Sequence, residues 1–75
     1  MIFIYSKHIL KRMWLRELTS EMIESAVNNP DHAEPAFRGR YLAQKKFHDK
    51  ILEVIYVDSN GQRILITAYW AEEIS

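Results

Sequence analysis

The chain has no cysteine, and this is the first of several absences that narrow its class. Without thiols it has neither a disulfide framework nor a thiolate zinc site. No apolar run approaches the roughly 18 residues that a membrane-spanning helix needs. The opening MIFIYSKH has only a short apolar run and no small-residue cleavage pattern, which is unlike a signal peptide. We therefore expect a cytoplasmic protein in which the whole chain is the working unit.

Glycine and net charge are also scarce. With only two glycines, the chain contains neither a glycine-rich phosphate loop nor a nucleophile elbow. Its ten basic and ten acidic residues cancel, unlike the basic profile of a protein that coats nucleic acid non-specifically. The three histidines show no metal-ligand spacing. We expect no metal and no other cofactor, and any contact with nucleic acid has to use a local patch.

What is present predicts a small folded unit. The 75 residues are 48% hydrophobic and 27% charged, which is ordinary for a globular protein and excludes a disordered chain. A chain of this length forms one domain, here residues 1–75, and buries roughly 60% of the surface it exposes when unfolded.

Residues 6–18 have the pattern of one amphipathic helix that begins at an N-capping Ser6. Four apolar side chains recur at helical spacing and form one face: Ile9, Leu10, Met13 and Trp14. The side chains of His8, Arg12 and Arg16 are spaced i, i+4, i+8, so they form a row along one edge of the helix. If the apolar face docks on a sheet, this row lies along the seam between helix and sheet.

A second helix follows directly. Thr19 can cap it, Leu18 and Ile23 are spaced for a hydrophobic staple, and the Asn29-Pro30 pair ends it. The preceding residues 2–5 are β-branched and aromatic, and the pattern leaves open whether they form a short strand or an apolar lead-in.

From Asp31 the periodicity changes to two, which indicates strands. We expect strands over residues 32–37, 40–47, 50–58 and 62–70, the first of them at an edge because it contains Pro35. Asn60-Gly61 predicts a type I′ hairpin turn. Helices followed by strands define an α+β fold, with two N-terminal helices packed on a three- to four-stranded antiparallel meander.

Strict alternation assigns the two faces of the last strand. One face holds Arg63, Leu65, Thr67 and Tyr69, and the other holds Ile64, Ile66, Ala68 and Trp70. The second set is the more apolar, so it is expected to face the core.

Several side chains can carry chemistry, each with a structural alternative. An imidazole exchanges protons near neutral pH, although a solvent-exposed or capping histidine in the first helical turn is the more common interpretation of an isolated residue such as His8. Arg12 and Arg16 can clamp a phosphate, or simply line a solvated helix edge. Lys45 and Lys46 put one cation on each sheet face. Thr67 and Tyr69 can hydrogen-bond a phosphate, although strand propensity alone also explains them.

The order of these pieces resembles a known family. His8-x-x-x-Arg12-Met13-x-x-Arg16 is followed by a capped helix ending Asn29-Pro30, then by Gly39-Arg40-Tyr41, ILEVIYV and a closing Ile66-Thr67-Ala68-Tyr69-Trp70. This order resembles the family catalogued as domain of unknown function 4258, which is similar to compact RelE/ParE-like (barnase-like) toxin endoribonucleases. The resemblance runs from about Ser6 to Trp70.

The resemblance implies the toxin of a bacterial toxin–antitoxin pair that cleaves RNA without a metal. His8 would act as acid or base, with Arg12 and Tyr69 as further catalytic residues. Four residues would bind RNA phosphate: Arg16, Arg40, Lys45 and Thr67. The implied partners are RNA and a cognate antitoxin protein, and a homodimer is compatible with the pattern.

Two other interpretations stay open. The chain can be a non-catalytic binding module, a toxin or regulatory partner that docks another protein through the Pro35 edge and the aromatic Tyr56, Tyr69 and Trp70. Alternatively, its polar residues serve the structure alone. Growth arrest on expression separates binding from catalysis. Arrest that survives His8→Ala indicates binding, and arrest that this variant loses without losing its fold indicates catalysis.

Overall fold

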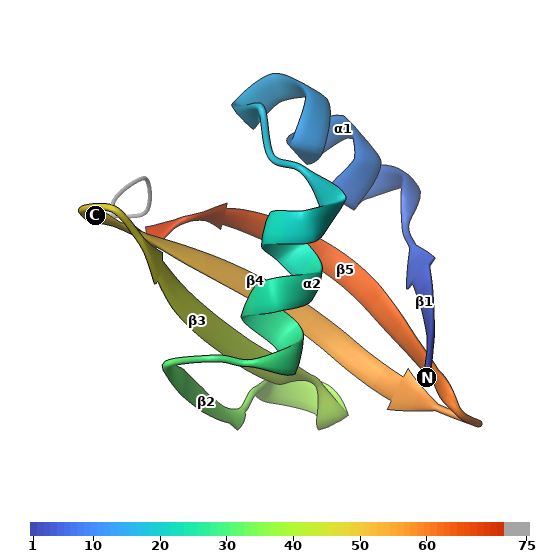
Figure 1. The fold of residues 1–75 in the computed structure, drawn as a ribbon. Helices are drawn as coiled ribbons and strands as arrows, with labels where there is room; N and C mark the ends of the chain where they lie inside the picture. The colour runs from blue at the N-terminus through green and yellow to red at the C-terminus, as the bar shows by residue number, and fades with distance from the viewer. Residues whose placement is uncertain (72–75) are drawn as a thin grey trace.

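A computed structural model describes residues 1–71 of the chain (Figure 1). The elements in chain order are β1 (Ile2–Tyr5), α1 (Lys7–Arg16), α2 (Ser20–Asn28), β2 (His32–Pro35), the 3-10 turn η1 (Phe37–Gly39), β3 (Tyr41–Phe47), β4 (Lys50–Ser59) and β5 (Gln62–Trp70). The α+β fold, with two helices packed on a sheet, is confirmed.

The sheet differs from the predicted one in its size and in one pairing. It has five strands in the order β1-β5-β4-β3-β2, and β1 runs parallel to β5. The segment 2–5, which the sequence pattern left undecided, supplies this extra strand. β1 leads straight into α1, so its connection to β5 passes through the helices and the other strands instead of a hairpin, which permits the parallel pairing. As Pro35 predicted, β2 lies at the opposite edge.

Ser6 joins α1 to β5. Its hydroxyl oxygen accepts a hydrogen bond from the Ile9 amide at 3.0 Å, as an N-cap does, and its hydroxyl donates to the Ile66 carbonyl at 2.8 Å. Figure 1 shows α1 continuing from the end of β1 on the β5 side of the sheet, and α1 contacts β5 directly. The helix ends at Glu17, whose left-handed backbone lets its amide bond back to Met13.

The second helix covers one face of the sheet. α2 crosses β3 and β4 (Figure 1), is capped by Thr19 through the Met22 amide, and ends at Asn29 before Pro30, as predicted. The core lies between α2, α1 and this face of the sheet. Its buried members are Ile9, Leu18, Ile23, Ala26, Val27, Ala43, Leu52, Val54, Tyr56, Leu65 and Ala68.

The last hairpin has the predicted turn. Asn60 and Gly61 both adopt positive φ, at 51° and 76°, as a type I′ turn requires. Its two strands, β4 and β5, pair along most of their length, and both have a neighbouring strand on each side in the sheet.

An irregularity in β5 corrects the predicted faces of that strand. Ile55 pairs with Thr67, but the next residue, Tyr56, pairs with Leu65, so Ile66 is an extra residue that shifts the alternation. Leu65 and Ala68 therefore both point into the core, while Thr67 and Tyr69 point to the opposite face. Strict alternation was wrong here because a residue pattern does not reveal where a bulge interrupts the pleat.

The double role of Ser6 predicts a large effect of its removal. We expect Ser6→Ala to lower the free energy of unfolding by about 2 kcal/mol, since it removes both an N-cap and a bond to β5. Thr19→Ala is the matched control, because Thr19 caps α2 through one bond only, and should cost about 1 kcal/mol. Urea unfolding of both variants measures the two losses. An equal or larger loss for Thr19→Ala would contradict the tie between α1 and β5.

Candidate functional site

Four polar side chains form a row across the sheet. Tyr69 pairs with Glu53, Glu53 with Gln44, and Gln44 with His32, one residue from each of four adjacent strands. Directly paired residues lie on the same side of a sheet. Because neighbouring Val54 points into the core beneath α2, the row lies on the opposite side, which we call the open face.

Glu53 is the centre of this row. It is only 6% exposed, and it is the one charged side chain in the buried class among residues 1–71. Tyr69 donates its hydroxyl to one carboxylate oxygen, and Gln44 Nε2 donates to the other at 2.6 Å. A buried carboxylate without donors would be costly, and these two bonds compensate its loss of water.

Tyr69 connects the row to α1. Burial raises the pKa of Tyr69 to about 12, helped by the hydrogen bond and the negative charge of Glu53. The positive charge of Arg12 acts in the opposite direction on the same pKa, so its guanidinium lies within electrostatic range of the phenol. Arg12 of α1 and Tyr69 of β5, both predicted as site residues, are therefore close enough for the charge of one to act on the other.

The tie at Ser6 explains how they meet. Starting from the Ser6–Ile66 bond, Arg12 is six residues along α1, about 9 Å at 1.5 Å per residue. Tyr69 is three residues along β5 from the same point, about 10 Å at 3.3 Å per residue. By the same arithmetic, the exposed His8 and the half-buried Thr67 of the open face are each about 3 Å along their own element from this bond.

Two of the predicted phosphate ligands lie elsewhere. Lys45 shares the α2 side of the sheet, where its Nζ donates to the Asn29 carbonyl at 2.9 Å and caps the end of α2. Arg40 is exposed just before β3, next to Tyr41, whose partner on β4 is Tyr56. Neither lies in the row of Tyr69.

Arg16 is the last residue of α1, in the same helical row as Arg12. Lys46, the neighbour of Lys45, points to the open face because it pairs with Ile51, next to Glu53 along the pleat. Between the two lysines that the sequence could not separate, Lys46 is therefore the one on the side of Tyr69.

The aromatic residues of the binding-module interpretation do not share a surface. Tyr56 is buried, stacks on Tyr41 with ring centroids 5.6 Å apart, and lies under the Arg63 guanidinium at 4.6 Å. Trp70 lies on the α2 side, with Lys50 Nζ 5.7 Å from its ring centroid. Of the three aromatics, only Tyr69 points to the open face.

The row of polar side chains ends in a hollow at the edge where β2 begins. The hollow has a volume of about 390 Å³ and is lined by Asp31, His32, Gln44, Lys45, Lys46 and Ile51. It shares His32 and Gln44 with the row, so a ligand at Tyr69 can extend toward it across the sheet.

Neither a metal site nor a membrane span is found in residues 1–71. No three side chains of His, Cys, Asp or Glu there gather closely enough to hold a metal ion together. No helix in the same range has the length and apolarity to cross a membrane.

The sequence analysis missed Glu53 and Gln44. A pattern that could have found Glu53 is present: it is the single charge inside the apolar run ILEVIYV. A lone carboxylate in the centre of a central strand needs donors on the neighbouring strands. Gln44 could be identified only once the register of β3 and β4 was known.

Comparison with known proteins places the chain in a family. Residues 5–70 match the family described as domain of unknown function DUF4258. The match leaves out only the first four and the last five residues, so the chain belongs to this family, as its ordered residues indicated. No curated protein and no solved structure matches the chain.

The Glu53–Tyr69 bond predicts a specific titration change. Glu53→Gln should lower the pKa of Tyr69 from about 12 while leaving it above 10, because burial, the largest cause, remains. Ultraviolet titration of the phenols, with Tyr69→Phe to assign the band, measures the shift. The matched control is Glu24→Gln, which should move only Tyr5, whose pKa burial and Glu24 also raise to about 12. If Glu24→Gln also shifted the pKa of Tyr69, the pairs Glu53–Tyr69 and Glu24–Tyr5 would not be independent.

The same two phenols predict alkaline unfolding. Their pKa is raised on folding from 10.0 to about 12, so the folded state holds these protons more tightly. The resulting stabilisation is complete below pH 10 and is lost as pH rises toward 12. Urea midpoints measured across this window should fall for the natural chain, and fall less for the variant Tyr5→Phe/Tyr69→Phe. Parallel profiles would contradict the assignment.

Proposed function

We propose that this protein is a small toxin-like endoribonuclease that cleaves RNA without a metal ion, at the junction of α1 and β5. The observation that carries the proposal is that the charge of Arg12 acts on Tyr69, whose hydroxyl is held by the buried Glu53. Such an RelE/ParE-like enzyme would be the cytoplasmic toxin of a bacterial pair, with RNA as substrate and an antitoxin protein as partner.

The reaction needs two proton transfers and one site for negative charge. The ribose 2′-oxygen attacks the adjacent phosphorus, a bond from phosphorus to the 5′-oxygen breaks, and a 2′,3′-cyclic phosphate and a 5′-hydroxyl result. A base removes the 2′-hydroxyl proton and an acid protonates the 5′-oxygen, while cations stabilise the phosphorane.

Arg12 is suited to the charged part of this reaction. A guanidinium presents planar donors that match two phosphate oxygens, and Arg12 is half-buried beside the sheet, where its charge is less screened by water. Arg16 adds a second guanidinium one turn further along the same helical row, and α1 contains no acidic residue. This provides the local patch that a chain of zero net charge needs for contact with RNA.

His8 and Tyr69 are suited to the proton transfers. His8 is exposed one turn before Arg12 in the same row, and its imidazole takes up or releases a proton. Tyr69 stays protonated at neutral pH and donates its proton to Glu53, which leaves its oxygen as an acceptor for a substrate hydroxyl. In this scheme the 2′-hydroxyl proton passes to Tyr69 as the phenol proton passes to Glu53, and His8 protonates the leaving oxygen.

Thr67 and Lys46 complete the path of the RNA. Thr67 lies beside Tyr69 along the open face and offers a hydroxyl to a phosphate oxygen. Lys46 lies on the same open face, two residues from Gln44 on β3, where its ammonium group can take the phosphate of the neighbouring nucleotide. We leave Lys45 and Arg40 out of the proposed site because of where their backbones and contacts place them.

Cleavage of RNA in the presence of a chelator tests the proposal. Purified protein should convert an oligoribonucleotide into fragments ending in a cyclic phosphate, detected by mass spectrometry. His8→Ala and Arg12→Ala should each lower the cleavage rate by about 10²–10⁴-fold, the usual loss for a positioned acid–base or charge-stabilising group.

Two matched substitutions serve as controls. Arg38→Ala removes an exposed arginine of η1, and Lys45→Ala removes the lysine at the end of α2, and both should retain cleavage within about threefold. Unchanged cleavage in both His8→Ala and Arg12→Ala would remove the proposed site. The variants should rank in the same order in the growth arrest that they cause on expression as in their rate of RNA cleavage.

A further inference from the structure

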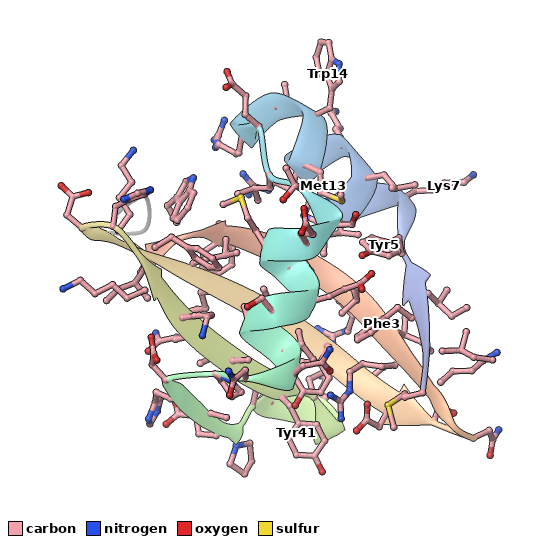
Figure 2. The ribbon with its side chains drawn as sticks, in the orientation of Figure 1. Phe3, Tyr5, Lys7, Met13, Trp14 and Tyr41 are labelled. Carbon is pink, nitrogen blue, oxygen red and sulfur yellow. The ribbon has the colours of Figure 1, made fainter. Side chains whose placement is uncertain are left out.

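The outward surface of α1 exposes three large apolar side chains. Trp14 is 81% exposed, Leu10 52% and Leu15 47%. Figure 2 shows Trp14 extending from α1 away from the sheet, whereas Met13, its neighbour, is turned toward the body of the molecule. Leu10 and Trp14 were predicted to share a core face with Ile9 and Met13, but the core takes only Ile9 and Met13 from α1.

Lysines lie within the same surface. At 100° per residue, Lys7 and Lys11 fall between Trp14 and Leu15 around the helix. Figure 2 shows Lys7 pointing away from the sheet as well. We call this group the outer face of α1; its members are Lys7, Leu10, Lys11, Trp14 and Leu15. α1 carries four basic residues and no acidic one, so in a neutral chain the remainder carries a formal charge of −4.

We infer that the outer face of α1 is a docking site for an acidic amphipathic helix of a partner protein. Leu10 and Trp14 are one helical turn apart, so apolar side chains repeating at three to four residues on a second helix can pack against them. Carboxylates flanking that apolar stripe meet Lys7 and Lys11. The opposite charges guide the encounter and fix which helix is accepted.

Other occupants fit this surface less well. RNA would satisfy the lysines and stack on Trp14, but exposed leucines gain little from a ribose-phosphate chain. A membrane would have to accept Lys7 and Lys11 in the middle of the apolar arc, where their charges would lie deepest. A second copy packing α1 against α1 would bring together two helices of charge +4.

The centre of this docking site lies away from Arg12. Trp14 and Arg12 are two residues apart, which places them about 160° from each other around the helix once a full turn is subtracted. Leu15, at the other margin of the outer face, is about 20° from His8 around the helix. A partner centred on Leu10 and Trp14 therefore leaves Arg12 accessible.

Binding of synthetic peptides to the full chain tests the inference. The probe is a fluorescein-labelled, end-blocked helical peptide of about 14 residues, with leucines at helical spacing flanked by glutamates. Fluorescence anisotropy should give a Kd below about 100 µM, and the same peptide with lysines for glutamates should bind at least tenfold more weakly. Trp14→Ala and Lys11→Glu should each weaken the glutamate peptide at least tenfold.

The controls separate this site from other aromatic surfaces and from catalysis. Phe37→Ala removes another exposed aromatic next to a cation, Arg38, on η1, and should leave peptide binding unchanged. His8→Ala should abolish RNA cleavage but not peptide binding, and Trp14→Ala should do the reverse. Failure of one proposal is thus distinguishable from failure of the other.

Several results would overturn the inference. One is equal binding of the two peptides, and another is a Kd weaker than about 1 mM for the glutamate peptide. A third is loss of cleavage in Trp14→Ala with retained fold, because the outer face would then belong to the RNA site. The same holds if Trp14→Ala keeps peptide binding but loses binding to phosphatidylserine vesicles, because the face would then bind a membrane. If Trp14→Ala keeps peptide binding but loses self-association in analytical ultracentrifugation, the face would instead bind a second copy of the chain.

Discussion

The arrangement of the molecule depends on one side chain, Ser6, which begins α1 and bonds to β5 at the same time. Its oxygen satisfies an amide of the first helical turn, and its proton goes to the carbonyl of Ile66, so the start of the helix has a fixed position along the strand. Arg12 is six helical steps from this bond and Tyr69 is three strand steps from it, which are nearly the same distance along the two elements. The charge of Arg12 acts on the Tyr69 hydroxyl.

The extra residue in β5, Ile66, determines which side of the sheet Tyr69 points to. If Ile66 took part in the regular alternation of the strand, Leu65 and Tyr69 would share one side, and Tyr69 would point beneath α2. With the bulge, Tyr69 reaches the open face and donates to Glu53, which Gln44 holds from the other side. A buried carboxylate needs hydrogen-bond donors, and the bulge brings the Tyr69 hydroxyl to Glu53, so the row of polar side chains depends on the bulge.

Much of this fold could be predicted from the sequence, because it rests on local chemistry. Caps at Ser6 and Thr19, the stop at Pro30 and the Asn60-Gly61 turn act within a few residues, and all appear as predicted. The parallel strand β1 and the bulge could not, since both depend on pairing between segments far apart in the chain. The candidate site divides in the same way: the row on α1 follows from helical spacing, whereas the two donors to Glu53 follow from register.

The account predicts one site, shared by α1 and β5, in a neutral chain whose first helix carries four of the ten basic residues and no acidic one. The most direct measurement is nuclear magnetic resonance of the full chain during titration with a short RNA that carries a 2′-deoxy sugar at the cleavage position, so that it binds without being cut. The account predicts that the side-chain resonance of Arg12 and the backbone resonances of Thr67 and Tyr69 shift together with one affinity, while the indole of Trp14 stays in place. Shifts confined to the outer face of α1, or no shift at Arg12 and Tyr69 at saturating RNA, would contradict it.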